Sequence, residues 1–174
     1  TIVRAGVEYV DIVDGDEIDV GQEAMYIGEA KVEKFGDPST LTITHSTREV
    51  LKGDRLMPAI PQTMEYNFTP HAPKNLVTGK IISVIDGVSR IGQYQTVVIN
   101  KGADHGMEKG HVMAIFQTGK TIDDELNQDR SDEVTLPSEH SGYLLIFRTF
   151  EKVSYALIMK ATREIHLMDR ITNP

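Results

Sequence analysis

Val32 to Pro58 reads VEKFGDPSTLTITHSTREVLKGDRLMP, and Phe147 to Asn173 reads FRTFEKVSYALIMKATREIHLMDRITN, 115 positions later. Aligned without a gap, these 27-residue stretches share eight identities, where ordinary composition gives on the order of two. The identical pairs are Phe35/Phe150, Ser39/Ser154, Ile43/Ile158, Thr47/Thr162, Arg48/Arg163, Glu49/Glu164, Asp54/Asp169 and Arg55/Arg170. Because the apolar alternation also keeps its phase, the pattern predicts one β substructure used twice, with Phe35 and Phe150 in similar surroundings.

Runs rich in β-branched and aromatic residues, separated by turn residues, dominate the chain, and no segment sustains helical periodicity beyond about two turns. The runs are Val7–Val13, Ala24–Val32, Thr40–Thr44, Val77–Val84, Thr96–Asn100, Val112–Phe116, Tyr143–Phe147 and Ser154–Met159. Short strands that meet at sharp corners suit small barrels. We therefore expect a mostly β fold, with two related small β-barrel or sandwich units from an internal duplication, possibly sharing strands.

Proline and charge mark the expected boundaries. Four of the 7 prolines lie between Pro58 and Pro73, and proline removes ladder donors, so this stretch should be an extended connector. We predict a first β unit at residues 1–58, a Pro-rich connector at 59–77 and a second β unit at 78–174. Lys120–Glu139 carries seven acidic and two basic residues between two strand signals, which predicts an acidic hairpin loop at about 120–140.

Composition excludes several classes of function. The net charge of -8 repels phosphate backbones, so we expect no nucleic-acid binding. The absence of cysteine excludes disulfides, thiol catalysis and cysteine-ligated zinc. No apolar run has the length of a membrane span, so we expect no membrane insertion by this fragment. Because the chain starts at Thr1 and already reads as structured from Val3, we expect its N-terminus to be a cut.

Catalytic and cofactor motifs are incomplete. Gly119-Lys120-Thr121 is similar to the end of a phosphate-binding loop, but Ala114 stands where that loop needs a glycine. Ser89 follows Gly87 as in a nucleophile elbow, but Ile91 occupies the second small-residue position. We therefore predict no catalytic residue, no cofactor and no enzymatic activity.

The six histidines form no dense ligand array. His105 and His111 flank the sequence GMEKG with Glu108 between them, and this spacing would allow the two rings to approach one another. Lone loop histidines are more often surface residues than ligands, so we predict no metal site.

Charged pairs and tyrosines are the remaining binding candidates. Asp54-Arg55 and Asp169-Arg170 recur at the ends of the two repeats. The structural interpretation is that each aspartate caps a turn and each arginine pairs with Glu49 or Glu164; the alternative is a site for a carboxylate or a glycan. Possible aromatic platforms for a glycan are Tyr26, Tyr66, Phe68, Tyr94 and Tyr143. We leave the ligand-binding residues unassigned.

Several blocks, in order, resemble a family of bacterial envelope proteins that carry a LysM peptidoglycan-binding module near the N-terminus. They include QEAMYIGEA (22–30), FGDPSTL (35–41), STREV (46–50), GKIISV (79–84), IGQYQ (91–95), GHVMAI (110–115) and FRTFE (147–151). The resemblance implies a periplasmic or cell-envelope location and a LysM module upstream of Thr1, absent from this chain, that binds peptidoglycan. It assigns no glycan-binding residue and no catalytic activity to the part of the family that this chain represents.

The sequence thus predicts a non-enzymatic accessory or scaffold region of a cell-wall-associated protein that contacts a protein partner in the envelope. The alternative is a module that itself binds a glycan or peptide. One departure between the repeats matters. Met168 stands where the first repeat has Gly53, and if Gly53 has positive φ, we expect the two turns to differ.

Overall fold

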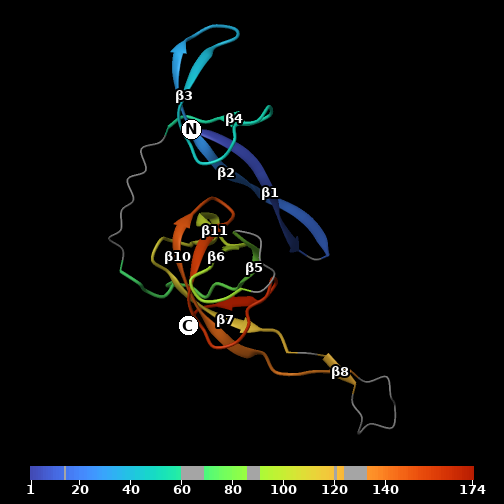
Figure 1. Cartoon of the computed structure of the whole chain (residues 1–174). Helices are drawn as coiled ribbons and strands as arrows, with labels where there is room; N and C mark the ends of the chain where they lie inside the picture. Colours follow the sequence, from blue (N-terminus) through green and yellow to red (C-terminus); the bar gives the residue numbers. More distant parts are fainter. Residues whose placement is uncertain (14, 60–68, 86–90, 120, 124–132) are drawn as a thin grey trace. The chain divides into compact units, whose positions relative to one another are not determined.

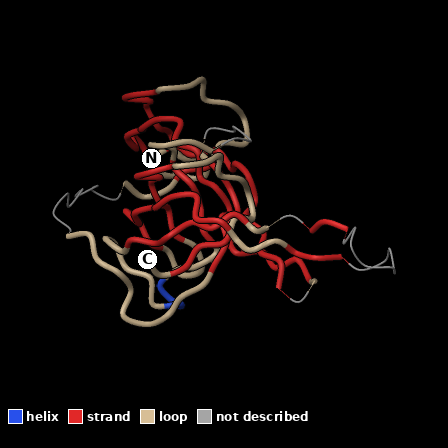
Figure 2. Tube along the Cα trace, turned by 90° about the horizontal axis from the view of Figure 1, so that it is seen from below, coloured by secondary structure: helices blue, strands red, loops and turns tan. Residues whose placement is uncertain are grey.

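The structure is a computed structural model that describes residues 1–13, 15–59, 69–85, 91–119, 121–123 and 133–174 (Figure 1). The described residues are nearly all strand and loop, and one short 3-10 helix, η1 (Ala103–His105), is the exception (Figure 2). The strands are β1 (Ile2–Val13), β2 (Asp16–Lys34), β3 (Thr40–Ser46), β4 (Arg55–Leu56), β5 (Gly79–Val84), β6 (Thr96–Ile99), β7 (Val112–Gln117), β8 (Thr121–Asp123), β9 (Glu133–Thr135), β10 (Glu139–Thr149), β11 (Ser154–Ala161) and β12 (Arg170–Thr172). The mostly β prediction is confirmed, and each of the eight predicted runs coincides with a strand.

The chain forms two compact units. Unit 1 comprises Thr1–Val10 and Gly21–Tyr66, and unit 2 comprises Asp11–Val20 and Asn67–Pro174. The end of the β1–β2 hairpin therefore groups with unit 2. The predicted connector lies partly at 60–68, outside the described residues, but its later part belongs to unit 2, where His71 forms a bridge with His111.

The main sheet of unit 1 is open, with the strand order β3-β2-β1-β4. Its hairpin β2–β3 is antiparallel and pairs Gly28 with Ser46, Ala30 with Ile43 and Val32 with Leu41. Two register shifts interrupt the ladder, one between Glu29 and Ala30 and one between Val32 and Lys34. Such shifts bend a strand and increase its twist, which is what curves a sheet toward a barrel.

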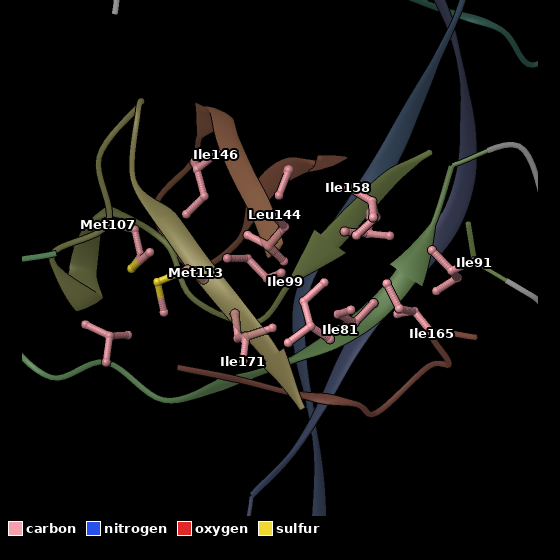
Figure 3. Packing of buried hydrophobic residues seen from close by; sticks show 14 residues of the cluster. Ile81, Ile91, Ile99, Met107, Met113, Leu144, Ile146, Ile158, Ile165 and Ile171 are labelled. Atoms are coloured by element: carbon pink, nitrogen blue, oxygen red, sulfur yellow. The ribbon is translucent and has the colours of Figure 1, made fainter. Parts of the chain in front are cut away.

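Unit 2 is a closed barrel of six strands in the order β10-β11-β6-β5-β12-β7. Branched aliphatic side chains fill its interior and come from every strand of the barrel (Figure 3). Ile81, Ile99, Ile115, Leu144, Ile146, Ile158 and Ile171 are fully buried there. Closure leaves no free edge in this barrel, and the packed interior accounts for its stability.

The barrel contains the hairpin of unit 1 a second time. β10 pairs with β11 through Gly142 and Ala161, Leu144 and Ile158, and Ile146 and Ala156, and its register shifts follow Tyr143 and Ile146. Each of these residues has a counterpart in the β2–β3 hairpin. The counterpart of a β10 residue lies 114 positions earlier in β2, and that of a β11 residue lies 115 positions earlier in β3. The short strands correspond as well, because β4 pairs with β1 as β12 pairs with β7. The four strands of the open sheet thus match β11-β10-β7-β12.

The expectation that the two turns differ at Gly53 and Met168 is wrong. Gly53 has a φ of 104°, but Met168 has a φ of 70°, so both residues adopt the left-handed conformation. The turns are closed alike, since the amide of Asp54 bonds the carbonyl of Leu51 and the amide of Asp169 bonds that of His166. A left-handed conformation costs a non-glycine residue about 1–2 kcal/mol, and the barrel imposes it on Met168.

Exchanging these two residues should change stability in opposite directions. We expect Gly53→Met to destabilise unit 1 by about 1 kcal/mol, because methionine bears the full left-handed cost. Met168→Gly should stabilise unit 2 by less than about 1 kcal/mol, because glycine has more conformational freedom to lose on folding. Denaturant unfolding followed by NMR signals from each unit measures both changes. Destabilisation of unit 2 by Met168→Gly would show that side-chain contacts of Met168 outweigh its backbone conformation.

The prediction of similar surroundings for Phe35 and Phe150 is also wrong. Phe35 is 84% exposed, whereas Phe150 packs against the ring of Tyr155 and under the guanidinium of Arg148. β10 has one extra residue before its turn, Thr149, and the counterpart of Tyr155 in the first hairpin is Thr40, which offers no ring to pack against. The shared scaffold therefore ends at the hairpin loop.

Candidate functional site

Three side chains of unit 2 form the one group in the described residues with the geometry for a metal ion. The nitrogen or carboxylate ligand atoms of His71, Glu108 and His111 all lie within 4.8 Å of one another. The amide of His71 donates to the carbonyl of Gly110 over 3.0 Å, and that of Val112 donates to the carbonyl of His71 over 2.8 Å. These bonds fix the two histidine backbones side by side, with the ring centroids 4.8 Å apart.

The hydrogen bonds of the rings decide what this cluster can bind. Nδ1 of His71 lies 2.8 Å from the carbonyl oxygen of Thr69, so it donates its proton there and leaves Nε2 free to act as a ligand. Nδ1 of His111 accepts the amide of Glu108 at 3.1 Å, which puts the proton of a neutral His111 on Nε2. Burial, together with the neighbouring His71, lowers the pKa of His111 below its usual value. His111 is therefore a neutral ring with the wrong tautomer for a metal ligand at Nε2.

Because of that tautomer, we expect zinc to bind this cluster poorly, in line with the sequence prediction of no metal. A ligand at about 100 times its Kd stabilises a protein by about 2.7 kcal/mol, so thermal unfolding reports tight binding directly. Equimolar zinc should leave the unfolding midpoint of unit 2 unchanged. A rise of the midpoint that His71→Ala abolishes and His105→Ala leaves intact would contradict this expectation.

The histidine pair suggested by the sequence is not the one that meets. Nδ1 of His105 accepts the amide of Gly102 at 3.3 Å, within its own turn, while His111 contacts His71. His71 lies in the predicted connector, and no local pattern relates it to residues forty positions later. Gly110 makes the contact possible, because a Cβ there would lie 3.1 Å from the carbonyl oxygen of Thr69.

The polar residues that recur in the two repeats bond the protein's own backbone. The amide and hydroxyl of Thr47 both donate to the carbonyl of Ile27, and those of Thr162 both donate to the carbonyl of Ser141. Ile27 and Ser141 are counterparts in the matched hairpins. The arginine that follows each threonine contacts a matched position. Arg48 donates a hydrogen bond to the sulfur of Met25, and Arg163 forms an ion pair with Glu139. Met25 and Glu139 each lie two positions before the residue whose carbonyl accepts from the threonine.

Asp54 and Asp169 cap the two turns, which confirms the structural interpretation of the recurring aspartates. An Asp54 oxygen accepts the amide of Leu51 at 2.8 Å, and an Asp169 oxygen accepts that of His166 at 2.9 Å. Their environments otherwise differ. The side chain of Asp54 is 4% exposed and accepts two hydrogen bonds from Arg4, of 2.7 and 2.9 Å, whereas Asp169 is 5% exposed and has no arginine partner among the described residues. Arg170 lies over the ring of Phe116, with 5.7 Å between the guanidinium carbon and the ring centroid.

These environments shift the pKa values of the two carboxyl groups in opposite directions. Hydrogen bonds from Arg4 and from the Leu51 amide lower the pKa of Asp54. Burial raises the pKa of Asp169, although the His166 amide opposes this shift. A lowered folded-state pKa means that ionised Asp54 stabilises unit 1 above the unfolded-state pKa, and that this stability is lost as the pH falls through the folded-state value. The raised folded-state pKa of Asp169 has the opposite effect on stability, so its ionisation destabilises unit 2 at neutral pH.

Asparagine substitutions of the two aspartates should therefore have different effects on the stabilities of the two units. We expect Asp54→Asn to destabilise unit 1 at pH 7 and to have a diminishing effect as the pH falls below about 4. Asp169→Asn keeps an oxygen for the His166 amide, so at pH 7 unit 2 should be as stable as the wild type or more stable. Unfolding curves from pH 3 to pH 7, read from NMR signals of each unit, measure both effects. Equal losses of stability in the two units at pH 7 would contradict the opposite pKa shifts of Asp54 and Asp169.

The structure describes only some of the remaining sequence candidates. Ser89, Lys120, Tyr66 and Phe68 lie outside the described residues. At Gly119 a side chain would overlap the carbonyl of Leu136, so this glycine permits a close approach of two chain segments. Tyr94 is 69% exposed and has a φ of 68°, an uncommon conformation for a bulky residue.

No protein-family model matches this chain, and a search of curated proteins found no relative. Among the described residues, no helix has both the length and the apolar character required to cross a bilayer.

Proposed function

We propose that this chain is a non-enzymatic accessory or scaffold region of a cell-wall-associated protein of the LysM type, located in the periplasm or cell envelope. The observation that carries this proposal is the use of the recurring polar side chains. Thr47, Thr162, Asp54 and Asp169 all bond backbone groups of their own unit, so what the two repeats have in common serves shape. We attribute the repeats to an internal duplication. In this account, the absent LysM module supplies the binding to peptidoglycan.

The acidic hairpin is the surface that we assign to a protein partner. β8 and β9 pair from Thr121 with Thr135 to Asp123 with Glu133, and they lie beyond the barrel strands of unit 2 (Figure 1). Thr121, Thr135 and Leu136 are exposed there. The acidic residues of the segment favour a basic patch on the partner, since opposite charges speed encounter and fix orientation.

Crosslinking in cells tests the partner. A photoreactive side chain at Thr121 or Leu136 should capture one protein, and the same group at exposed Lys74 should not. Raising the salt concentration should weaken capture in lysates, because the attraction between surface charges is screened. Equal capture from all three positions, or none from the hairpin, would contradict a partner at this surface.

The alternative, a glycan- or peptide-binding module, finds support in Tyr94. Its ring is exposed and its backbone has a positive φ, and residues with strained backbones cluster at active sites and ligand clamps. Sedimentation with purified peptidoglycan separates the two functions. Our proposal expects the chain to stay in the supernatant. Saturable co-pelleting that Tyr94→Ala abolishes would contradict our proposal and support a glycan-binding module.

A further inference from the structure

Part of the apolar face of the unit 1 sheet is exposed, although its counterpart in unit 2 is buried. Ile43 is 52% exposed while Ile158 is 0% exposed, and Leu56 is 57% exposed while Ile171 is 0% exposed. Ala30 and Val32 are partly exposed, whereas their counterparts Leu144 and Ile146 lie in the barrel core. These inward positions are thus apolar in both units, but in unit 1 they remain in contact with water. Ile2, the counterpart of Ile115, is an exception and is 3% exposed.

The difference between the units is two strands. In unit 2, β5 pairs with β12 and β6 pairs with β11, so these two strands close the barrel between its other four. They bring Ile81, Val97 and Ile99 into the core, all 0% exposed. Ile81 and Ile99 are labelled in Figure 3. In unit 1, the outer edges of β3 and β4 have no strand neighbour among the described residues. An open apolar sheet with free edges is a template for added strands.

We propose that the unit 1 sheet is a binding site for one antiparallel pair of β-strands that presents branched aliphatic side chains and closes it into a six-stranded barrel. The first strand pairs with β4 as β5 pairs with β12, and the second pairs with β3 as β6 pairs with β11. Ile43 and Leu56 become core residues on closure. This inference rests on the matched registers of the two units and not on the proposed function.

Strand order indicates where the pair is attached. In unit 2 the closing strands precede β7 in the same polypeptide, and twelve residues separate Ile99 from Val112. The counterpart of β7 is β1. We therefore assign the closing pair of unit 1 to the N-terminal side of β1 in the same polypeptide. Pairing of two open sheets from two copies of the chain would cover the same face without a closing strand pair, so a self-associated dimer is an outcome that counts against the proposal.

A cysteine reporter tests closure, because the chain contains no other thiol. The variant Ile43→Cys is made in the chain as it is and in a chain with an N-terminal extension. The extension carries a copy of the sequence from Val77 to Lys101 and a flexible tether of twelve residues. A second extension has serine at the copies of Ile81, Val97 and Ile99. Thr42→Cys, on the opposite face of the same strand, serves as the control for general protection.

We expect the thiol at position 43 to react rapidly with a maleimide in the unextended chain and at least tenfold more slowly with the aliphatic extension. The serine extension and the reporter at position 42 should show no such slowing. Equal rates with and without the aliphatic extension, equal protection by both extensions, or protection that appears only as the unextended chain dimerises would each overturn the proposal. Amide hydrogen exchange at Leu41 and Ile43 in chains without a cysteine provides an independent reading of the same closure. The sedimentation and crosslinking experiments above report on the proposed function separately.

Discussion

Gly142→Ala should unfold the barrel of unit 2. A Cβ at this position would overlap the carbonyl oxygen of Lys160 and lie 3.2 Å from the Cα of Ala161. Both obstacles are backbone atoms of β11, so no rotamer change relieves the overlap, and the β10–β11 ladder must separate at this point. A core change of this kind belongs to the group of substitutions that cost more than about 4 kcal/mol, which is a large share of the stability of a small domain.

The measurement is the fraction of folded unit 2 in the variant, from dispersed NMR signals of Ile158 and Ile171. We expect those signals to collapse into the unfolded region of the spectrum. Gly28→Ala is the matched variant in unit 1, because a Cβ there would meet the carbonyl of His45 and lie 2.9 Å from the Cα of Ser46. It should remove the signals of unit 1. A well-folded Gly142→Ala barrel would mean that the two strands do not approach as described.

Ile158→Ala should destabilise unit 2 by about 3 kcal/mol, whereas Ile43→Ala should cost unit 1 less than about 1 kcal/mol. The two isoleucines occupy the same position of the matched hairpins, opposite Leu144 and Ala30. Ile158 is fully buried and its removal leaves a cavity among aliphatic neighbours, while Ile43 is 52% exposed and loses little contact. Residue type and position in the matched hairpin are shared, so the difference reports the burial that the two additional strands provide in unit 2.

Denaturant unfolding of both variants provides the comparison. If the chain carries the aliphatic N-terminal extension described above, the cost of Ile43→Ala should rise toward that of Ile158→Ala. Equal costs in the unextended chain would show that the face of unit 1 is already covered.

The sequence predicted the strands well, because alternation of apolar residues follows from the need of one sheet face for burial. It located the repeated hairpin through Thr47/Thr162 and Asp54/Asp169, whose side chains bond the backbone in the same way in both units. The alignment was misplaced by one residue on the first strand of each hairpin. An ungapped comparison matches Val32 with Phe147, whereas the ladders match it with Ile146, because Thr149 is an extra residue before the second turn.

Tertiary context accounts for what the sequence did not reveal. Met168 has positive φ because a closed barrel fixes its turn, and intrinsic preference alone argues against that conformation. His71 meets His111 through a bridge between distant segments. β4 and β12 contain two and three residues, too few to show alternation. The exposed face of unit 1 is a property of pairing, since Ile43 and Ile158 look the same in the sequence.

The most direct test of the account is the register of the two hairpins in solution, read from cross-strand backbone NOEs. We predict NOEs between Lys31 and Thr42 in unit 1 and between Leu145 and Leu157 in unit 2, with a break on either side of each pair where the register shifts. If the two units use one scaffold, the breaks fall at matched positions in both. A register in β2–β3 displaced by one residue from that of β10–β11 would contradict the claim that the two units share one scaffold.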